Sequence, residues 1–125
     1  MTTFTVPGRP VPKKRPRLGY GGRRAYVYTP RETLAYEEAV GWAARPHFPK
    51  PLEGPVSVKL DVYLATGKRG DLDNYSKSIL DGVNEIAFRD DSQVARLEAS
   101  LRRCPHGQER VEVEVAEIAE EAMSG

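Results

Sequence analysis

Residues 56–64 read Val-Ser-Val-Lys-Leu-Asp-Val-Tyr-Leu, and this alternation of apolar and polar side chains decides the fold. Successive side chains of a β-strand point to opposite faces of the sheet, so the alternation predicts a strand with one buried face. Residues 3–6 and 108–118 alternate in the same way, and a strand over residues 97–101 would place Leu97, Ala99 and Leu101 inward. The sequence therefore predicts a sheet of about four strands.

A first helix is predicted from Thr29 to about Arg45. Thr29 is a good N-cap residue, Pro30 suits the first helical position, and Glu32 lies three residues after the cap, as in a capping box. Helical spacing then predicts one face toward the sheet and Trp42 on the flank. The residues expected on that inward face are Tyr36, Ala39, Val40 and Ala43.

A second helix is predicted from Asp73 onward, with an apolar stripe made of Tyr75, Ile79, Val83 and Ile86. The order strand, arm, helix, strand, helix, strand, strand predicts an α+β fold. In this fold a mixed sheet of about four strands carries two helices packed on it. At 125 residues the chain fits one domain over residues 1–125, in which 1–28 form the first strand plus a basic arm and 120–125 a frayed tail.

Five Asp residues and one Lys gather between positions 70 and 94, in a segment predicted to run from a strand end through a helix to the next strand. They are Asp71, Asp73, Lys77, Asp81, Asp90 and Asp91. Hard cations such as Mg²⁺ prefer carboxylate oxygens, and carboxylates from separate elements leave positions for water and a phosphate. The pattern predicts a shared metal site built from Asp71, Asp73 and one residue of the Asp90–Asp91 pair.

Neighbouring residues on a strand face opposite ways, so only one of Asp90 and Asp91 is expected to bind the metal. Asp73, Lys77 and Asp81 share a polar helix face at spacings of four residues, and Asp71 lies just before the helix. Singly, each Asp near a helix start has an ordinary alternative role as a cap or a surface acid. Residues expected to support the site without binding metal are Asn74, Asp81, Asp90 and Gln93.

The N-terminal part of the chain is strongly basic. Residues 1–31 carry eight Lys or Arg and no acid, whereas residues 109–121 carry six Glu and one Arg. Prolines at 10, 12 and 16 exclude a helix and favour an extended arm, for which the alternative is a solvated loop. Tyr20, Tyr26 and Tyr28 among the cations favour contact with nucleic acid. The predicted DNA-binding residues are Lys13, Lys14, Arg15, Arg17, Arg23, Arg24, Lys68 and Arg69.

Because the arm has little apolar pattern, replacing its cations is expected to weaken DNA binding and to leave folding almost unchanged. The chain has no apolar run near the ~20 residues of a membrane helix, no signal-peptide pattern at its start and a single Cys, so a cytoplasmic protein without membrane contact is expected. A structural zinc site is not expected, because it needs four N or S ligands and the chain offers only Cys104, His47 and His106.

Several motifs occur in the order found in one known family. They are Pro12-Lys13-x-Arg15-Pro16-Arg17, Tyr28-Thr29-Pro30 with Thr33 and Tyr36-Glu37, Gly70-Asp71-Leu72-Asp73-Asn74 with Lys77, Asp81 and Asn84, and Asp90-Asp91-Ser92-Gln93-Val94. In this combination, over roughly residues 4 to 100, the chain resembles the RusA-type crossover junction endodeoxyribonucleases, small resolvases that are often encoded by prophages. The acidic last strand matches no motif of that family.

The resemblance implies a homodimer that binds four-way DNA junctions, the Holliday junctions of recombination and repair. With Mg²⁺ it would nick two opposing strands. The catalytic acids of the family correspond to Asp71, Asp73 and Asp91, and its essential lysine to Lys77. A symmetric dimer also suits a junction whose two cut strands are related by an approximate two-fold axis. Its expected surfaces include Trp42, Tyr63 and Phe88, since aromatic residues are enriched at interfaces.

The residues and the resemblance together predict a Mg²⁺-dependent endodeoxyribonuclease in which a metal-activated water attacks a DNA phosphodiester in line. Lys77 would donate to that phosphate or orient the water. Alternatives are a nuclease for other branched DNA or RNA, and a non-catalytic junction-binding module with a structural ion. A phosphotransferase or sugar transferase with an Asp-x-Asp metal site is disfavoured, because it would have little use for a polycationic arm.

Overall fold

The computed structural model describes residues 1–22, 24–66 and 70–119, so the predictions made for Arg23, Lys68, Arg69 and the tail 120–125 lie outside the described residues. The elements in chain order are β1 (Thr2–Pro7), β2 (Arg17–Gly21), β3 (Arg24–Tyr28), α1 (Arg31–Ala44), η1 (Arg45–His47), β4 (Val56–Leu64), α2 (Leu72–Val83), η2 (Asp91–Gln93), β5 (Val94–Arg103) and β6 (Arg110–Glu117). The two η elements are single turns of 3₁₀ helix.

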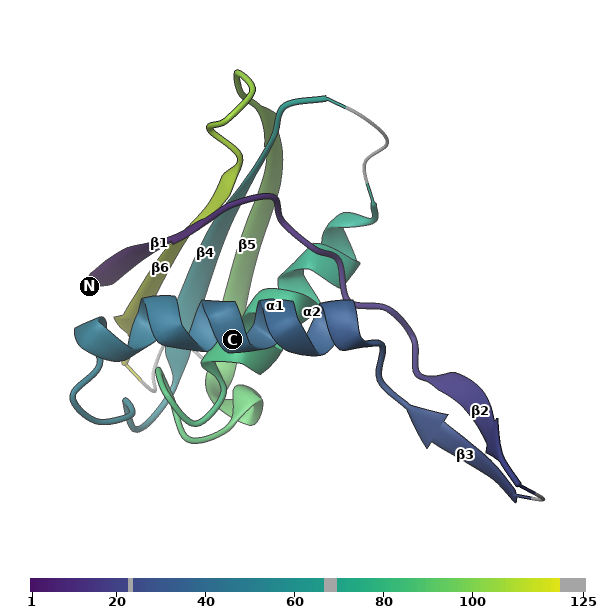
Figure 1. Cartoon of the computed structure of the whole chain (residues 1–125). Coiled ribbons are helices and arrows are strands. Elements are labelled where there is room, and N and C mark those ends of the chain that lie inside the picture. The colour runs from purple at the N-terminus through teal and green to yellow at the C-terminus, as the bar shows by residue number, and fades with distance from the viewer. Residues whose placement is uncertain (23, 67–69, 120–125) are drawn as a thin grey trace.

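The predicted α+β architecture is confirmed. The main sheet has four strands in the order β1-β6-β4-β5, in which β4 pairs parallel with β5 and antiparallel with β6. Both helices lie on one face of this sheet, and β2 and β3 form a separate two-stranded ribbon that projects from the body (Figure 1). The path from β4 through α2 to its parallel neighbour β5 is the crossover that carries the acidic residues.

The core lies between the sheet and the helices, as the alternation in β4 predicts. All five apolar residues of β4 from Val56 to Leu64 are buried, whereas Lys59 is exposed and the other polar residues are half-buried on the opposite, uncovered face. Val111, Val113 and Val115 of β6 bury the same face of their strand. One face of the sheet is thus covered by helices, and the other is polar.

The inward face of α1 differs in detail from its prediction. Tyr36 and Val40 are buried as expected and Ala43 is half-buried, but Ala39 is exposed and Thr33, Gly41 and Ala44 take part in the buried stripe. The reason is the crossing with α2, which turns the Gly41 side of α1 inward. Trp42 is on the flank, with 64% of its surface exposed.

The predicted capping box at the start of α1 is wrong. The N-cap is Pro30 rather than Thr29, and no side chain caps the helix. Glu32 instead accepts a hydrogen bond from Lys14 Nζ at 2.9 Å, so its carboxylate is directed toward the basic arm. The second helix also ends earlier than expected, at Val83, because Glu85 adopts a positive φ of 69°.

The helices α1 and α2 approach closely where Gly41 faces Gly82. A Cβ atom on Gly82 would lie 2.6 Å from Val40 Cβ and 2.9 Å from the carbonyl oxygen of Glu37. Real Cβ atoms are not found at such distances from backbone or branched carbon atoms, so only glycine fits. This contact sets the spacing between α1 and α2, and with it the position of α2 below the arm.

Replacing Gly82 by Ala is therefore expected to lower the free energy of unfolding by about 1–3 kcal/mol, the range for overpacked cores. In an unobstructed helix the same change raises stability by roughly 1 kcal/mol, so the sign identifies the clash. Urea unfolding measures the effect. Ala39→Leu, which adds volume on the exposed face of α1, serves as the control and should leave stability nearly unchanged. A Gly82→Ala protein more stable than the wild type would contradict the close crossing.

Candidate active site

The N-terminus of α2 presents two carboxylates to solvent. Asp71 is the N-cap residue and Asp73 lies in the first turn, and both are exposed. The backbone carbonyl of Asp71 accepts from the N–H groups of Asn74 and Tyr75, at 3.0 and 3.2 Å. Its side chain makes no capping bond. Within the part of the chain that the structure describes, neither carboxylate forms an ion pair, so both are available to a cation.

Gly70 holds the loop that leads into this helix. Its N–H donates to the hydroxyl of Tyr75 at 3.1 Å, and a Cβ atom on Gly70 would meet the ring of Pro12 at 3.2 Å. Tyr75 is buried, so the contact is anchored in the core. The loop that leads into α2 is thus in contact with Pro12 of the basic arm.

The first half of the arm is packed on the helices, although its short apolar pattern predicted that it contributes little to folding. Pro10 is buried and Val11 is half-buried. The Lys13 N–H donates to the Asn74 carbonyl at 2.8 Å, and the buried Ser78 hydroxyl donates to the Val11 carbonyl at 2.7 Å. The apolar pattern is short, but the backbone polar groups of this extended segment are satisfied by α2. Only the ribbon β2–β3 projects freely (Figure 1).

Lys13 lies in an ion-pair cluster that joins the arm to both helices. Its Nζ is 2.7 Å from Asp81 Oδ2 of α2 and 3.2 Å from Glu37 Oε2 of α1. Burial by itself lowers the pKa of the Lys13 ammonium, but the hydrogen bonds and charges of Asp81 and Glu37 outweigh it, so the net pKa is raised. Lys13 thus holds the arm to both helices in the free protein. For Lys13 to contact DNA as predicted, a phosphate would have to replace Asp81 and Glu37 as its partner.

Replacing Lys13 by Ala is expected to lower stability by roughly 1 kcal/mol, a discounted value because Asp81 is 39% exposed. A raised lysine pKa stabilises the folded state below the unfolded pKa, and this contribution is lost as the pH rises through the folded pKa. The Tm should therefore fall by about 3–5 °C near neutral pH. If Lys13 is an anchor, the salt dependence of DNA binding will be unchanged.

Arg15 is the matched comparison, because it is exposed and makes no ion pair with any described residue. Arg15→Ala should leave the Tm unchanged and flatten the log–log salt slope of DNA binding by about one unit. The reverse pattern, with a lower slope for Lys13→Ala and a lower Tm for Arg15→Ala, would exchange the two roles.

A pocket of about 510 Å³, here called the arm pocket, lies between the arm and α2. Its lining consists of residues 12–16 of the arm together with Gly70, Asp71 and Asn74. The lining thus combines the cations of residues 13–15 with Asp71, whose carboxylate has no ion pair with a described residue. Such a pocket can place a phosphate beside a carboxylate-bound cation. Asn74 borders the pocket, and Lys77 is exposed one turn beyond Asp73. Asp81 is paired with Lys13.

The segment with Asp90 and Asp91 is a turn of 3₁₀ helix rather than the start of a strand. The two side chains therefore need not point to opposite faces, as they would on a strand. Asp90 Oδ2 accepts from the Ser92 N–H at 3.0 Å, and Gln93 Oε1 accepts from the Asp90 N–H, which completes a capping box. The hydrogen bonds that the Asp90 carboxylate accepts from Ser92 lower its pKa. Asp91, next to it, is exposed. Asp90 therefore has a structural role in this turn, whereas Asp91 makes no ion pair with any described residue.

Gln93 fixes this turn to the opposite end of the sheet from Asp71. Its amide nitrogen donates to the carbonyls of Leu52 and Gly54, just before β4 begins, whereas Asp71 follows the end of β4. The two positions are separated by the length of α2, about 18 Å for twelve residues. Accordingly, no three His, Cys, Asp or Glu side chains among the described residues of one chain are grouped closely enough to hold a metal ion.

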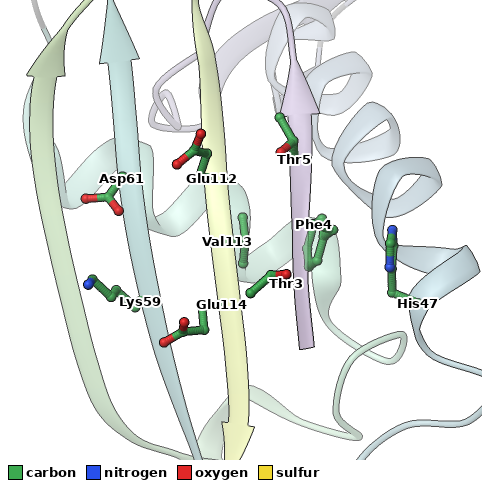
Figure 2. A pocket seen from close by; sticks show the side chains of 9 residues that line it. All are labelled: Thr3, Phe4, Thr5, His47, Lys59, Asp61, Glu112, Val113 and Glu114. Carbon is green, nitrogen blue, oxygen red and sulfur yellow. The ribbon is translucent and has the colours of Figure 1, made fainter. Parts of the chain in front are cut away.

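A second pocket, also of about 510 Å³, lies over β1, β6 and β4 on the polar face of the sheet and contains none of the predicted site residues (Figure 2). Asp61, Glu112 and Glu114 project there from β4 and β6, with Lys59 beside them. Glu112 already pairs with Arg110 at 3.0 Å, and Asp61 with Arg102 at 2.9 Å. Two of the three carboxylates of this polar face are therefore already paired with arginines.

Comparison with known proteins agrees with this geometry. Exposed carboxylates at a helix N-terminus beside a cationic arm are features of an enzyme that processes nucleic acid. The family model described as Endodeoxyribonuclease RusA matches residues 7–116. The chain therefore belongs to the RusA endodeoxyribonuclease family, and the predicted resemblance is confirmed. It is also 29% identical over 138 residues to the Uncharacterized protein YqaN of Bacillus subtilis (strain 168), covering 93% of this chain and 96% of that protein.

Family membership makes the chain an endodeoxyribonuclease, a hydrolase of DNA phosphodiesters, and implies a Holliday-junction-resolving enzyme of DNA recombination. RusA nucleases generally depend on a divalent metal ion. Among the helices of the described residues, none has the length and apolar character needed to span a bilayer.

Proposed function

We propose that this protein is a Mg²⁺-dependent nuclease that binds four-way DNA junctions in the cytoplasm and resolves them by paired nicks. The observation that carries the proposal is the arm pocket, whose lining combines the cations of residues 13–15 with Asp71. Arg15 and the Asp71 carboxylate have no ion pair with a described residue, whereas Lys13 and Lys14 are held by acids of the two helices. Cations alone would suit any polyanion, and carboxylates alone would repel DNA. Their combination suits a phosphodiester held next to a bound cation.

Asp71, Asp73 and Asp91 are the proposed metal-binding residues. The donor set fits a hard cation, since all three are exposed carboxylates without an ion pair to any described residue. When bound, Mg²⁺ would lower the pKa of a water molecule and offset the negative charge that builds up on the phosphate. Lys77, exposed one turn from Asp73, is positioned on the same helix face to donate to a phosphate oxygen.

A metal site that includes Asp91 requires two chains, because one chain holds Asp91 at the opposite end of α2 from Asp71. β5 is an edge strand of the sheet, and Leu97 on it is 44% exposed. A two-fold axis beside β5 would align the β5 strands of two chains antiparallel. The start of one β5 would then lie beside the end of the other, next to the second chain's Leu64 and the loop toward its Asp71.

The homodimer is therefore proposed with the free edge of β5 as its surface. Of the aromatic residues predicted for the interface, Phe88 is fully buried in the core and is withdrawn, whereas Trp42 is exposed and Tyr63 half-buried on the polar face. Leu97→Arg would place like charges across the two-fold axis. Light scattering coupled to size exclusion should then show a change from two chains to one, with the Tm retained.

The test of the function itself uses a labelled four-way junction, a flap, a linear duplex and an RNA hairpin, each with and without Mg²⁺. We expect paired nicks in opposing strands of the junction only when Mg²⁺ is present. Preferential cutting of the flap or the hairpin would show that the substrate is another branched DNA or an RNA. Tight binding of the junction without cutting in Mg²⁺ or Mn²⁺ would support a binding module with a structural ion.

A further inference from the structure

The ribbon β2–β3 exposes large apolar side chains that no described residue of the chain covers. Tyr26 is 52% exposed and Tyr28 41%, and every residue of β3 is exposed. The ribbon projects away from the sheet and the helices (Figure 1). Clustered exposed apolar side chains on a small domain generally mark a surface that binds something.

The register of the ribbon separates its side chains into two faces. Residues paired across antiparallel strands share a face, and Gly19 pairs with Tyr26 while Gly21 pairs with Arg24. Because alternate residues of a strand also share a face, Arg24, Tyr26 and Tyr28 lie together above the two glycines. The opposite face carries the pairs Leu18–Val27 and Tyr20–Ala25. Two neighbouring tyrosines and an arginine thus share one face, whereas the other face has a single tyrosine among aliphatic side chains.

The ring of Tyr26 lies over Gly19, where any larger residue would overlap it. A Cβ atom on Gly19 would lie 2.5 Å from Tyr26 Cζ, and one on Gly21 would lie 3.5 Å from Tyr26 Cε1. The tyrosine ring therefore lies against Gly19 and Gly21, with its other face toward solvent. The Tyr28 ring is adjacent, 5.8 Å away between centroids and tilted by 45°. The two rings thus lie side by side on one face of the ribbon.

We propose that Tyr26 and Tyr28 form a stacking platform for unpaired nucleobases at the branch point of the DNA substrate. This inference rests on the proposed function and adds a base contact to a surface that would otherwise contact only phosphates. Duplex DNA hides the faces of its bases, so a flat aromatic surface has a partner only where bases are unpaired. Arg24, on the same face, supplies charge for the neighbouring phosphate.

The test compares binding of two single-stranded probes of equal length and charge, oligo-dT and its abasic counterpart. No divalent metal is present, so a failed nuclease and a failed platform give different results. The wild type should bind oligo-dT more tightly by about fivefold to a hundredfold, the range for one stacked base. Tyr26→Ala should remove this preference while leaving binding of the abasic probe unchanged.

Matched variants separate stacking from folding of the ribbon. Tyr26→Phe and Tyr26→Trp should keep the preference, whereas Tyr26→Leu, apolar but not aromatic, should lose it. Leu18→Ser, on the opposite face, should leave the preference unchanged, and Gly19→Val should abolish it by displacing the tyrosine ring. A junction with abasic nucleotides at its branch point should respond to Tyr26→Ala less than an intact junction.

Three outcomes would overturn the proposal. Equal affinity of the wild type for oligo-dT and the abasic probe would show that no base is stacked. An equal loss for both probes in Tyr26→Ala would show that the ribbon only positions cations. A fall in oligomeric mass caused by Tyr26→Ala, with DNA binding retained, would show that a second copy of the chain covers the rings.

Discussion

Replacing Asp73 by Asn is expected to reduce junction cleavage by about a thousandfold or more, while junction binding is kept or tightened. Asn has the shape of Asp without the anionic charge that a hard cation requires. Loss of about 4 kcal/mol of transition-state stabilisation by the metal corresponds to that factor. Binding is spared because Asp73 is exposed and makes no ion pair with the rest of the described chain, and because one repulsive charge near DNA is removed. Gel-shift and cleavage assays on one labelled junction measure both quantities.

Asp71→Asn and Asp91→Asn should behave in the same way, and Asp90→Asn is the matched control. Asn is as good an N-cap as Asp, so the bond from the Ser92 N–H to residue 90 survives the change. Asp90→Asn should therefore cleave at close to the wild-type rate. Strong Mg²⁺-dependent cutting by Asp73→Asn would remove Asp73 from the metal site. An inactive Asp90→Asn beside an active Asp91→Asn would reverse the choice between these neighbours.

Mixing two inactive variants, Asp73→Asn and Asp91→Asn, is expected to restore cleavage from background to a readily measured rate of single nicking. In a dimer with shared sites, one site of the mixed dimer receives both substitutions and the other receives neither. The intact site combines Asp71 and Asp73 of one chain with Asp91 of the other. Two chains are needed because α2, about 18 Å long, separates Asp71 and Asp73 from Asp91 within one chain.

The control mixture is Asp71→Asn with Asp73→Asn. Both residues belong to the same helix N-terminus, so each site of that mixed dimer keeps one damaged residue and cleavage should stay at background. Differently tagged chains, purified by both tags in sequence, ensure that mixed dimers are assayed. A purified Asp73→Asn/Asp91→Asn mixed dimer without activity would mean that each site belongs to one chain and that α2 or η2 moves on binding DNA.

Much of the fold could be predicted from local patterns. The alternation of Val56 to Leu64 requires one buried face at any register, and the helical stripe that begins at Tyr75 requires packing on it. Both follow from the spacing of apolar residues, which does not depend on the rest of the chain. The boundaries could not be predicted as well, since the cap of α1 depends on a distant contact between Glu32 and Lys14.

The sequence by itself determined the α+β class, the family and which side chains carry charge. Only the tertiary structure decided which of those charges meet. Asp71 and Asp91 are twenty residues apart along the chain, and the crossover through α2 places them at opposite ends of the sheet. Lys13 and Asp81 are sixty-eight residues apart, and the packing of the arm on α2 brings them to 2.7 Å. Residue type is a local property, whereas electrostatic partnership depends on distance in the folded chain.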